Sequence, residues 1–186
     1  MSTKIFTLIL MAATLLTGCG SIRGVLASSE FTDATDHFSV KFPGGASDIE
    51  TEHGKAKNKY IFAPGTTYSK SFDNHSDSYR SYEVNAFSMQ TDPPKDGLAE
   101  KTILSFGLNG WDDEPEATTK EVTINGMHAL DCVRTVTLGP ASMTFREVVF
   151  WSPTQQMLYV LRIAATNKAN VSTKEAEDFI ASFRMA

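Results

Sequence analysis

The chain has 186 residues, of which 41% are hydrophobic and 21% charged, and its formal net charge is −5. These values are typical of one globular domain, and a chain of this length buries enough apolar surface to fold without a disulfide or a metal. The acidic balance and the lack of any Lys/Arg cluster argue against a nucleic-acid partner, because phosphate binding needs a concentrated basic face.

The N-terminus carries a targeting signal. Lys4 precedes an apolar run, Ile5 to Leu16, that is too short to span a bilayer but suits the apolar region of a signal peptide. The next residues complete the sequence Leu16-Thr17-Gly18-Cys19. This sequence resembles the lipobox of bacterial lipoproteins, in which the cysteine is acylated, with fatty acids such as palmitate, and the peptide is cut just before it. The alternatives are an ordinary secretory signal with an incidental cysteine, or a short membrane anchor.

The lipobox resemblance implies three segments: a signal peptide over residues 1–18, a flexible tether over 19–36 and a folded domain over 37–186. It also implies lipidation of Cys19 and a domain in the periplasm. By the same resemblance, a lipoprotein retained in the inner membrane would have Asp directly after the cysteine. This chain has Gly20 there, which implies the outer membrane. Two or more acyl chains hold a protein stably in a leaflet. We therefore expect Cys19→Ser to release the protein into the soluble periplasmic fraction.

The first half of the domain is predicted to contain strands separated by turns. Alternating apolar residues from Phe38 to Phe42 indicate a half-buried strand that ends at Pro43-Gly44-Gly45. Short strands are also expected at 60–62 and 82–89, whereas residues 46–59 have no clear pattern. The segment 66–81 is rich in Ser, Asp, Asn and Tyr, which predicts a long exposed loop, with a ragged strand at one end as the alternative.

The second half has stronger patterns. Asn125-Gly126 is typical of a tight turn between strands, since both of its central residues need positive φ. Ser172 and Glu175 have the spacing of a capping box, which predicts the start of a terminal helix. In that helix, one apolar face is expected from Ala176, Phe179, Ile180 and Phe183. The remaining expected elements are a helix at 96–108 and strands at 121–125, 129–138, 143–151 and 157–165.

This order of elements resembles the PsbP-like fold, named after an extrinsic subunit of photosystem II. The resemblance covers about residues 31–186, with Phe38, Pro43, Gly126, Tyr159 and Phe183 in family-like places. It implies an α+β fold: a single domain that is an α-β-α sandwich on an antiparallel sheet. It also implies a binding or accessory module more than an enzyme, and it transfers no functional residue.

Two sets of residues in and around the 66–81 loop are candidate sites. Asp73, His75 and Asp77 place oxygen and imidazole donors at alternate positions, a pattern that suits a metal ion but is also common in solvated loops. Tyr68, Tyr79 and Tyr82 offer a partner surface, since tyrosine among Ser and Asn is common in adaptable binding sites. The alternative is that these rings cover one edge of the sheet.

Other features favour ordinary structural roles. Cys132 alternates with apolar residues and is expected to be buried and inert. Arg134, on the same strand face, is expected at an edge, snorkelling to solvent, or paired with an acid. The acidic run 112–116 suits a solvated loop or a cationic partner.

No catalytic or cofactor-binding motif is present in the sequence, so no cofactor is expected. The leading hypothesis is a lipid-tethered periplasmic binding or accessory module that contacts an envelope protein through the 66–81 loop. The alternative is a metal carrier or enzyme that uses the same loop.

Overall fold

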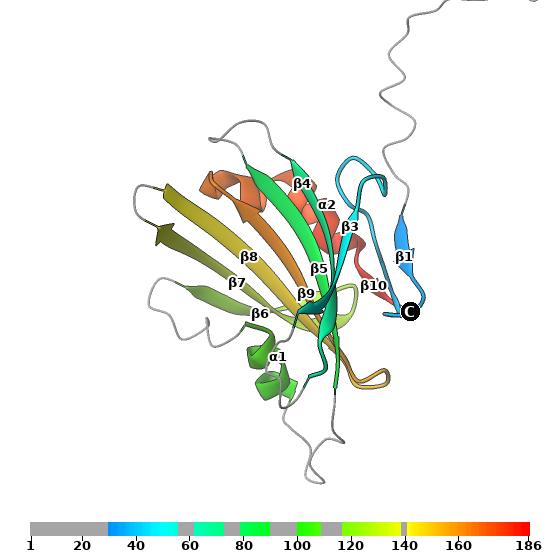
Figure 1. The fold of residues 1–186 in the computed structure, drawn as a ribbon. Coiled ribbons are helices and arrows are strands. Elements are labelled where there is room, and N and C mark those ends of the chain that lie inside the picture. Colours follow the sequence, from blue (N-terminus) through cyan, green and yellow to red (C-terminus); the bar gives the residue numbers. More distant parts are fainter. Residues whose placement is uncertain (1–29, 56–61, 73–78, 90–99, 109–116, 139–140) are drawn as a thin grey trace, which may run out of the picture.

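A computed structural model of the chain describes residues 30–55, 62–72, 79–89, 100–108, 117–138 and 141–186. A seven-stranded antiparallel sheet in the order β3-β4-β5-β9-β8-β7-β6 forms its centre (Figure 1). The strands are β3 (Glu50–Lys55), β4 (Gly65–Phe72), β5 (Arg80–Ser88), β6 (Thr118–Ile124), β7 (Met127–Leu138), β8 (Ala141–Ser152) and β9 (Met157–Ala165). The central strand β9 is buried along nearly its whole length, so its side chains contribute to the apolar clusters on both faces of the sheet.

A small second sheet packs beside the first. Its order is β1-β2-β10, from β1 (Phe31–Asp33), β2 (Phe38–Val40) and β10 (Arg184–Met185). The predicted tether over 19–36 is therefore wrong for the residues of β1. Phe31 anchors this strand, because its ring lies 5.9 Å from Phe38 and 5.2 Å from Tyr68 between centroids.

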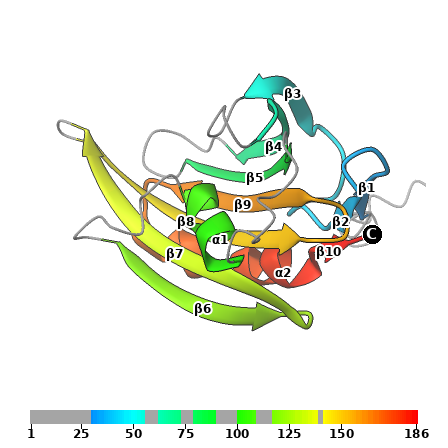
Figure 2. The ribbon, with the colours of Figure 1, turned by 90° about the horizontal axis from the view of Figure 1, so that it is seen from below.

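The two helices cover opposite faces of the seven-stranded sheet (Figure 2). Helix α1 (Glu100–Leu108) packs on one face, over an apolar cluster that includes Phe87, Val149 and Leu158. On the other face, the larger cluster is covered by the 3₁₀ turn η2 (Lys168–Ser172), by α2 (Lys174–Ser182) and by the small sheet. The predicted α-β-α sandwich on an antiparallel sheet is confirmed.

Helix α2 has the predicted apolar face but a different cap. Ala176, Phe179, Ile180 and Phe183 are all buried. The Thr173 hydroxyl, not Ser172, accepts a hydrogen bond from the backbone N–H of Ala176 at 3.3 Å. The predicted capping box is wrong because Ser172 ends η2, and the chain becomes extended only at Thr173.

The predicted long loop at 66–81 is also wrong, since most of it lies in β4 and β5. Its polar side chains have partners elsewhere in the fold. Thr67 Oγ1 donates to Asn85 Oδ1 at 2.7 Å, and Lys70 Nζ donates to the carbonyls of Gly45 and Ser47 at 3.0 and 2.9 Å. These contacts let a Ser/Thr/Lys-rich segment form a buried strand.

The turn prediction at Asn125-Gly126 is confirmed. Both residues have positive φ, 56° and 80°, and they join β6 to β7 in register, with Ile124 opposite Met127. The final hairpin of β8 and β9 is confirmed as well, and pairs Ser152 with Met157 at its turn.

Candidate functional site

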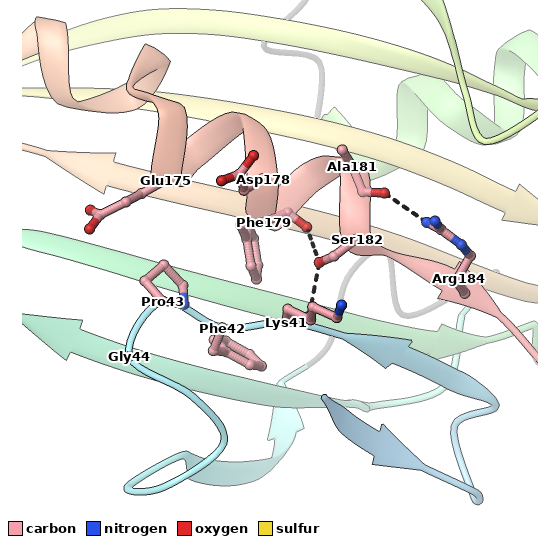
Figure 3. A pocket seen from close by; sticks show the side chains of 10 residues that line it. All are labelled: Lys41, Phe42, Pro43, Gly44, Glu175, Asp178, Phe179, Ala181, Ser182 and Arg184. Atoms are coloured by element: carbon pink, nitrogen blue, oxygen red, sulfur yellow. Dashed lines mark hydrogen bonds between the residues drawn. The ribbon is translucent and has the colours of Figure 1, made fainter. Parts of the chain in front are cut away.

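An open groove of about 600 Å³ lies between α2 and residues 41–44, which follow β2 (Figure 3). The buried rings of Phe42 and Phe179, 5.3 Å apart between centroids, form its floor. The hydroxyl of Ser182 joins the two walls: it accepts from the backbone N–H of Lys41 at 2.9 Å and donates to the carbonyl of Phe179 at 2.7 Å. The groove therefore has a defined shape.

One end of the groove is acidic, and its charges are paired. The carboxylate of Glu175 lies 2.9 Å from the guanidinium of Arg80, and that of Asp178 lies 2.5 Å from the ammonium of Lys174. Both glutamate and aspartate are exposed. Exposed ion pairs of this kind contribute little to stability. The paired cations nevertheless offset the two carboxylates, so this end of the groove has almost no net charge.

The other end is formed by Lys41 and Arg184, whose side chains are exposed (Figure 3). Arg184 Nη1 donates to the carbonyls of Ala181 and Phe183 at 2.7 and 2.8 Å, which are the last carbonyls of α2. Within the described residues, neither cation forms an ion pair. The two ends of the groove therefore differ in electrostatic character.

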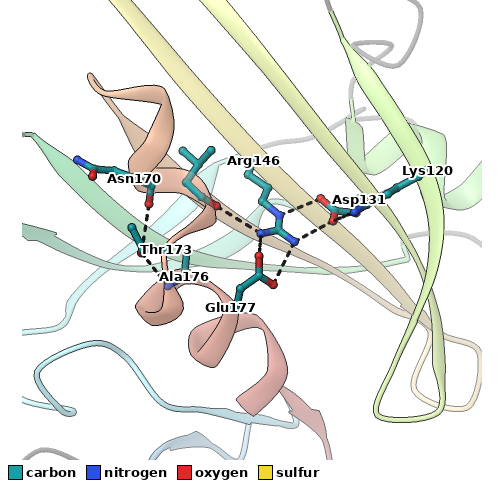
Figure 4. Close-up of polar contacts among 8 residues, drawn as sticks. Lys120, Asp131, Arg146, Asn170, Thr173, Ala176 and Glu177 are labelled. Atoms are coloured by element: carbon teal, nitrogen blue, oxygen red, sulfur yellow. Dashed lines mark hydrogen bonds and ion pairs between the residues drawn. The ribbon is translucent and has the colours of Figure 1, made fainter.

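A buried arginine fixes α2, one wall of the groove, to the sheet (Figure 4). Arg146 on β8 donates from Nε and Nη2 to the two carboxylate oxygens of Asp131 on β7, at 3.0 and 2.9 Å. Its Nη1 lies 2.5 Å from Glu177 of α2. Burial alone would lower the pKa of Arg146, but the hydrogen bonds that it donates to the carboxylates of Asp131 and Glu177 outweigh burial and raise that pKa. The guanidinium stays charged and holds the helix.

The Asn125-Gly126 turn fixes the other end of α2. Asn125 Nδ2 donates to the carbonyls of Ala181 and Phe183 at 2.9 and 3.0 Å. The last carbonyls of a helix have no partner within the helix, and here Asn125 and Arg184 both donate to the carbonyls of Ala181 and Phe183. Asn125, which suits the turn because it adopts a positive φ, thus also positions α2, one wall of the groove.

The predicted tyrosine surface is wrong for two of its three residues. Tyr68 and Tyr82 are buried, with 4% and 0% of their surface exposed, and both lie in the core under α2 and the small sheet. Tyr68 donates from its hydroxyl to Asp36 at 2.9 Å, and burial together with that carboxylate raises the pKa of the phenol. Tyr79 is half-buried, and its role in a partner surface stays a prediction.

Asp73, His75 and Asp77 lie outside the described residues, as does the acidic run 112–116, so a metal site there stays a prediction. In the part of the chain that the structure describes, no three His, Cys, Asp or Glu side chains gather closely enough to hold a metal ion.

Cys132 is buried, as predicted. Arg134 pairs with Phe145 of β8, while the pairing of β7 with β6 ends at Val133, so Arg134 is at an edge on its β6 side, one of the predicted alternatives. Its guanidinium lies 4.7 Å from the centre of the Phe145 ring, a stacking arrangement that explains a cation among apolar neighbours.

Neither a scan against protein-family models nor a search of curated protein sequences gives a match. Among solved structures, a protein of Bacteroides thetaiotaomicron VPI-5482 is similar, with a TM-score of 0.53, 12% identity, and coverage of 86% of this chain and 49% of that one. This chain therefore spans about half the length of that protein. The likeness supports the fold, and the PsbP-like resemblance stays a prediction.

Two further structures are more distant. LpqN, described as involved in cell envelope biogenesis of Mycobacterium tuberculosis, has a TM-score of 0.49 and 13% identity, covering 80% of this chain and 83% of that one. The Saccharomyces cerevisiae Ran-binding protein Mog1p has a TM-score of 0.45 and 8% identity, covering 86% and 96%. At these scores, neither likeness supports a conclusion about this chain.

Proposed function

We propose that the protein is a lipid-anchored binding or accessory module of the bacterial envelope, held at the outer membrane and facing the periplasm. The observation that carries the proposal is the sequence Leu16-Thr17-Gly18-Cys19, ahead of a folded domain whose first described residue is Glu30. Among the helices that the structure describes, none is both long and apolar enough to cross a bilayer.

The distance from the anchor to the fold supports this arrangement. Glu30 is the first described residue, eleven positions after Cys19. Even a fully extended chain of that length spans at most about 40 Å. An acylated Cys19 would therefore keep the domain, and the groove beside α2, close to the membrane surface.

Metabolic labelling with palmitate tests the proposal. We expect label on the wild-type protein in a bacterial host and on Cys132→Ser, but none on Cys19→Ser. The two variants are matched, because residues 19 and 132 are the two cysteines of the chain and both changes replace one sulfur by oxygen. Unlabelled wild-type protein, or equal labelling of Cys19→Ser, would contradict lipid anchoring.

Gly20 allows a test of the membrane. If the residue after the cysteine directs sorting, Gly20→Asp should move the protein from the outer-membrane to the inner-membrane fraction without loss of palmitate label. Wild-type protein that sediments with the inner membrane would overturn the outer-membrane assignment while leaving the anchor intact.

A further inference from the structure

The chain enters the fold beside the cationic end of the groove. Phe31 pairs with Val40 in the small sheet, and Lys41 follows directly. In Figure 1, β1 and β10 lie together at one side of the molecule, far from the end of the large sheet where β7 and β8 meet. If Cys19 carries the anchor, this side is the one that the connecting chain keeps nearest the membrane.

Lys41 and Arg184 lie on one face of the small sheet. Arg184 is opposite Ser39, and although β2 ends at Val40, buried and more exposed residues keep alternating from Phe38 to Phe42, so Lys41 is on the same side as Ser39 and Arg184. Diagonal neighbours of this kind have Cα atoms about 7–8 Å apart. Two exposed cations at this separation can contact one phosphate group together.

One carboxylate lies near these cations. Glu30 accepts a hydrogen bond from the Ser39 hydroxyl at 2.8 Å, so it is beside the face that carries Lys41 and Arg184, but within the described residues it forms an ion pair with neither cation, and the two cations outnumber it. Glu175 and Asp178 are ion-paired at the far end of the groove. Ala186 lies at the opposite end of β2 from Lys41, because its backbone N–H donates to the carbonyl of His37 at 2.8 Å.

We propose that Lys41 and Arg184 bind the phosphate groups of anionic phospholipids in the membrane that carries the anchor. The groove then opens along the bilayer surface. This inference rests on the proposed lipid anchoring. It identifies anionic phospholipid as the ligand at the cationic end of the groove. Each basic residue close to an anionic bilayer favours the bound orientation about fivefold, and this attraction decays within about 10 Å in physiological salt.

The test uses the full lipidated protein in lipid nanodiscs with a paramagnetic headgroup label. One disc contains phosphatidylcholine, and the other an equal mixture of phosphatidylcholine and phosphatidylglycerol. In the mixed disc we expect strong broadening of the backbone amide signals of Lys41, Phe42 and Gly44 and of residues 182–185, and little at Ser142, on the distant end of β8. In the phosphatidylcholine disc, broadening at the groove should fall about fivefold or more.

Lys41→Glu should abolish the dependence on phosphatidylglycerol, whereas Lys168→Glu, with the same charge change on the exposed turn η2, should preserve it. Lys41 is suited to this test because its backbone N–H, not its side chain, makes the bond to Ser182, so the variant should fold. Broadening that ignores lipid charge, or that Lys41→Glu leaves unchanged, would overturn the proposal. Protein that fails to stay in the discs would instead overturn the lipid anchor.

Discussion

The two faces of the seven-stranded sheet are covered by different means. On one face, α1 packs through Ile103, Leu104 and Leu108 on a compact apolar cluster. On the other, α2 packs on a larger aromatic core and is also held by the Arg146–Asp131–Glu177 network. Apolar contacts place a helix on a surface, while directional polar contacts also fix its position along that surface.

This difference matters because α2, not α1, forms a wall of the groove. Polar contacts from several parts of the fold hold α2. They come from strands through Arg80 of β5 and Arg146 of β8, from Asn125 in the β6–β7 turn and from the backbone of Lys41, after β2. The side of the molecule that we assign to binding is therefore the side whose geometry is most constrained.

The largest expected effect is on the buried network. Arg146→Ala removes the guanidinium bonds to Asp131 and Glu177 and leaves the buried Asp131 only the exposed ammonium of Lys120, 3.4 Å away, which should reduce the free energy of unfolding by about 3 kcal/mol. Arg80→Ala is the matched control, because Arg80 also pairs with a glutamate of α2 but near solvent, and it should cost at most about 1 kcal/mol. Urea denaturation measures both. Equal losses of unfolding free energy in the two variants would show that the buried network stabilises this face no more than an exposed ion pair does.

Alkaline pH should weaken the same face. Burial raises the pKa of Tyr68 and Tyr159 in the folded protein, whereas the unfolded phenols titrate near 10. Their stabilising effect is therefore complete below pH about 10 and is lost above it, at up to about 1.4 kcal/mol per pH unit for each phenol. The urea midpoint should fall above pH 10, and less steeply in Tyr159→Phe. A flat midpoint would contradict their burial.

On the α1 face, Gly107→Ala should destabilise by about 1–3 kcal/mol, although alanine normally favours a helix. A Cβ atom at this position would lie 2.4 Å from Val149 Cγ1. Adding Val149→Ala should restore part of the loss, as thermal unfolding can measure. A gain in stability from Gly107→Ala alone would mean that α1 does not approach the sheet so closely.

The smallest expected effect concerns the turn that reaches α2. Asn125→Gly keeps the positive φ but removes two hydrogen bonds to the helix end, and should cost about 1 kcal/mol. Asn125→Ala should cost more, because it also strains the turn. Amide exchange should accelerate in the last turn of α2 in both variants. Unchanged exchange in Asn125→Gly would show that the cap is dispensable.

Local sequence patterns were sufficient to predict the elements that depend on residues close together in the chain. The Asn-Gly turn, the β8–β9 hairpin and the apolar face of α2 follow from turn chemistry and periodicity. β4 was missed because Lys70 and Thr67 find partners far away in sequence, so a buried strand has the composition of a loop.

The site could not be predicted for the same reason. The walls of the groove, residues 41–44 and α2, are separated by most of the domain, and Arg146 meets Asp131 and Glu177 only after the sheet has formed. The Pro43-Gly44-Gly45 turn marked one wall as a strand end, but nothing local indicated that a helix would lie beside it.

The mass of the mature N-terminal peptide tests the central claim most directly. We predict that protein purified from bacterial membranes begins at Cys19 and that this residue carries a diacylglyceryl group and an amide-linked fatty acid. A chain that retains residues 1–18, or one that is cut elsewhere and has an unmodified Cys19, would contradict the account.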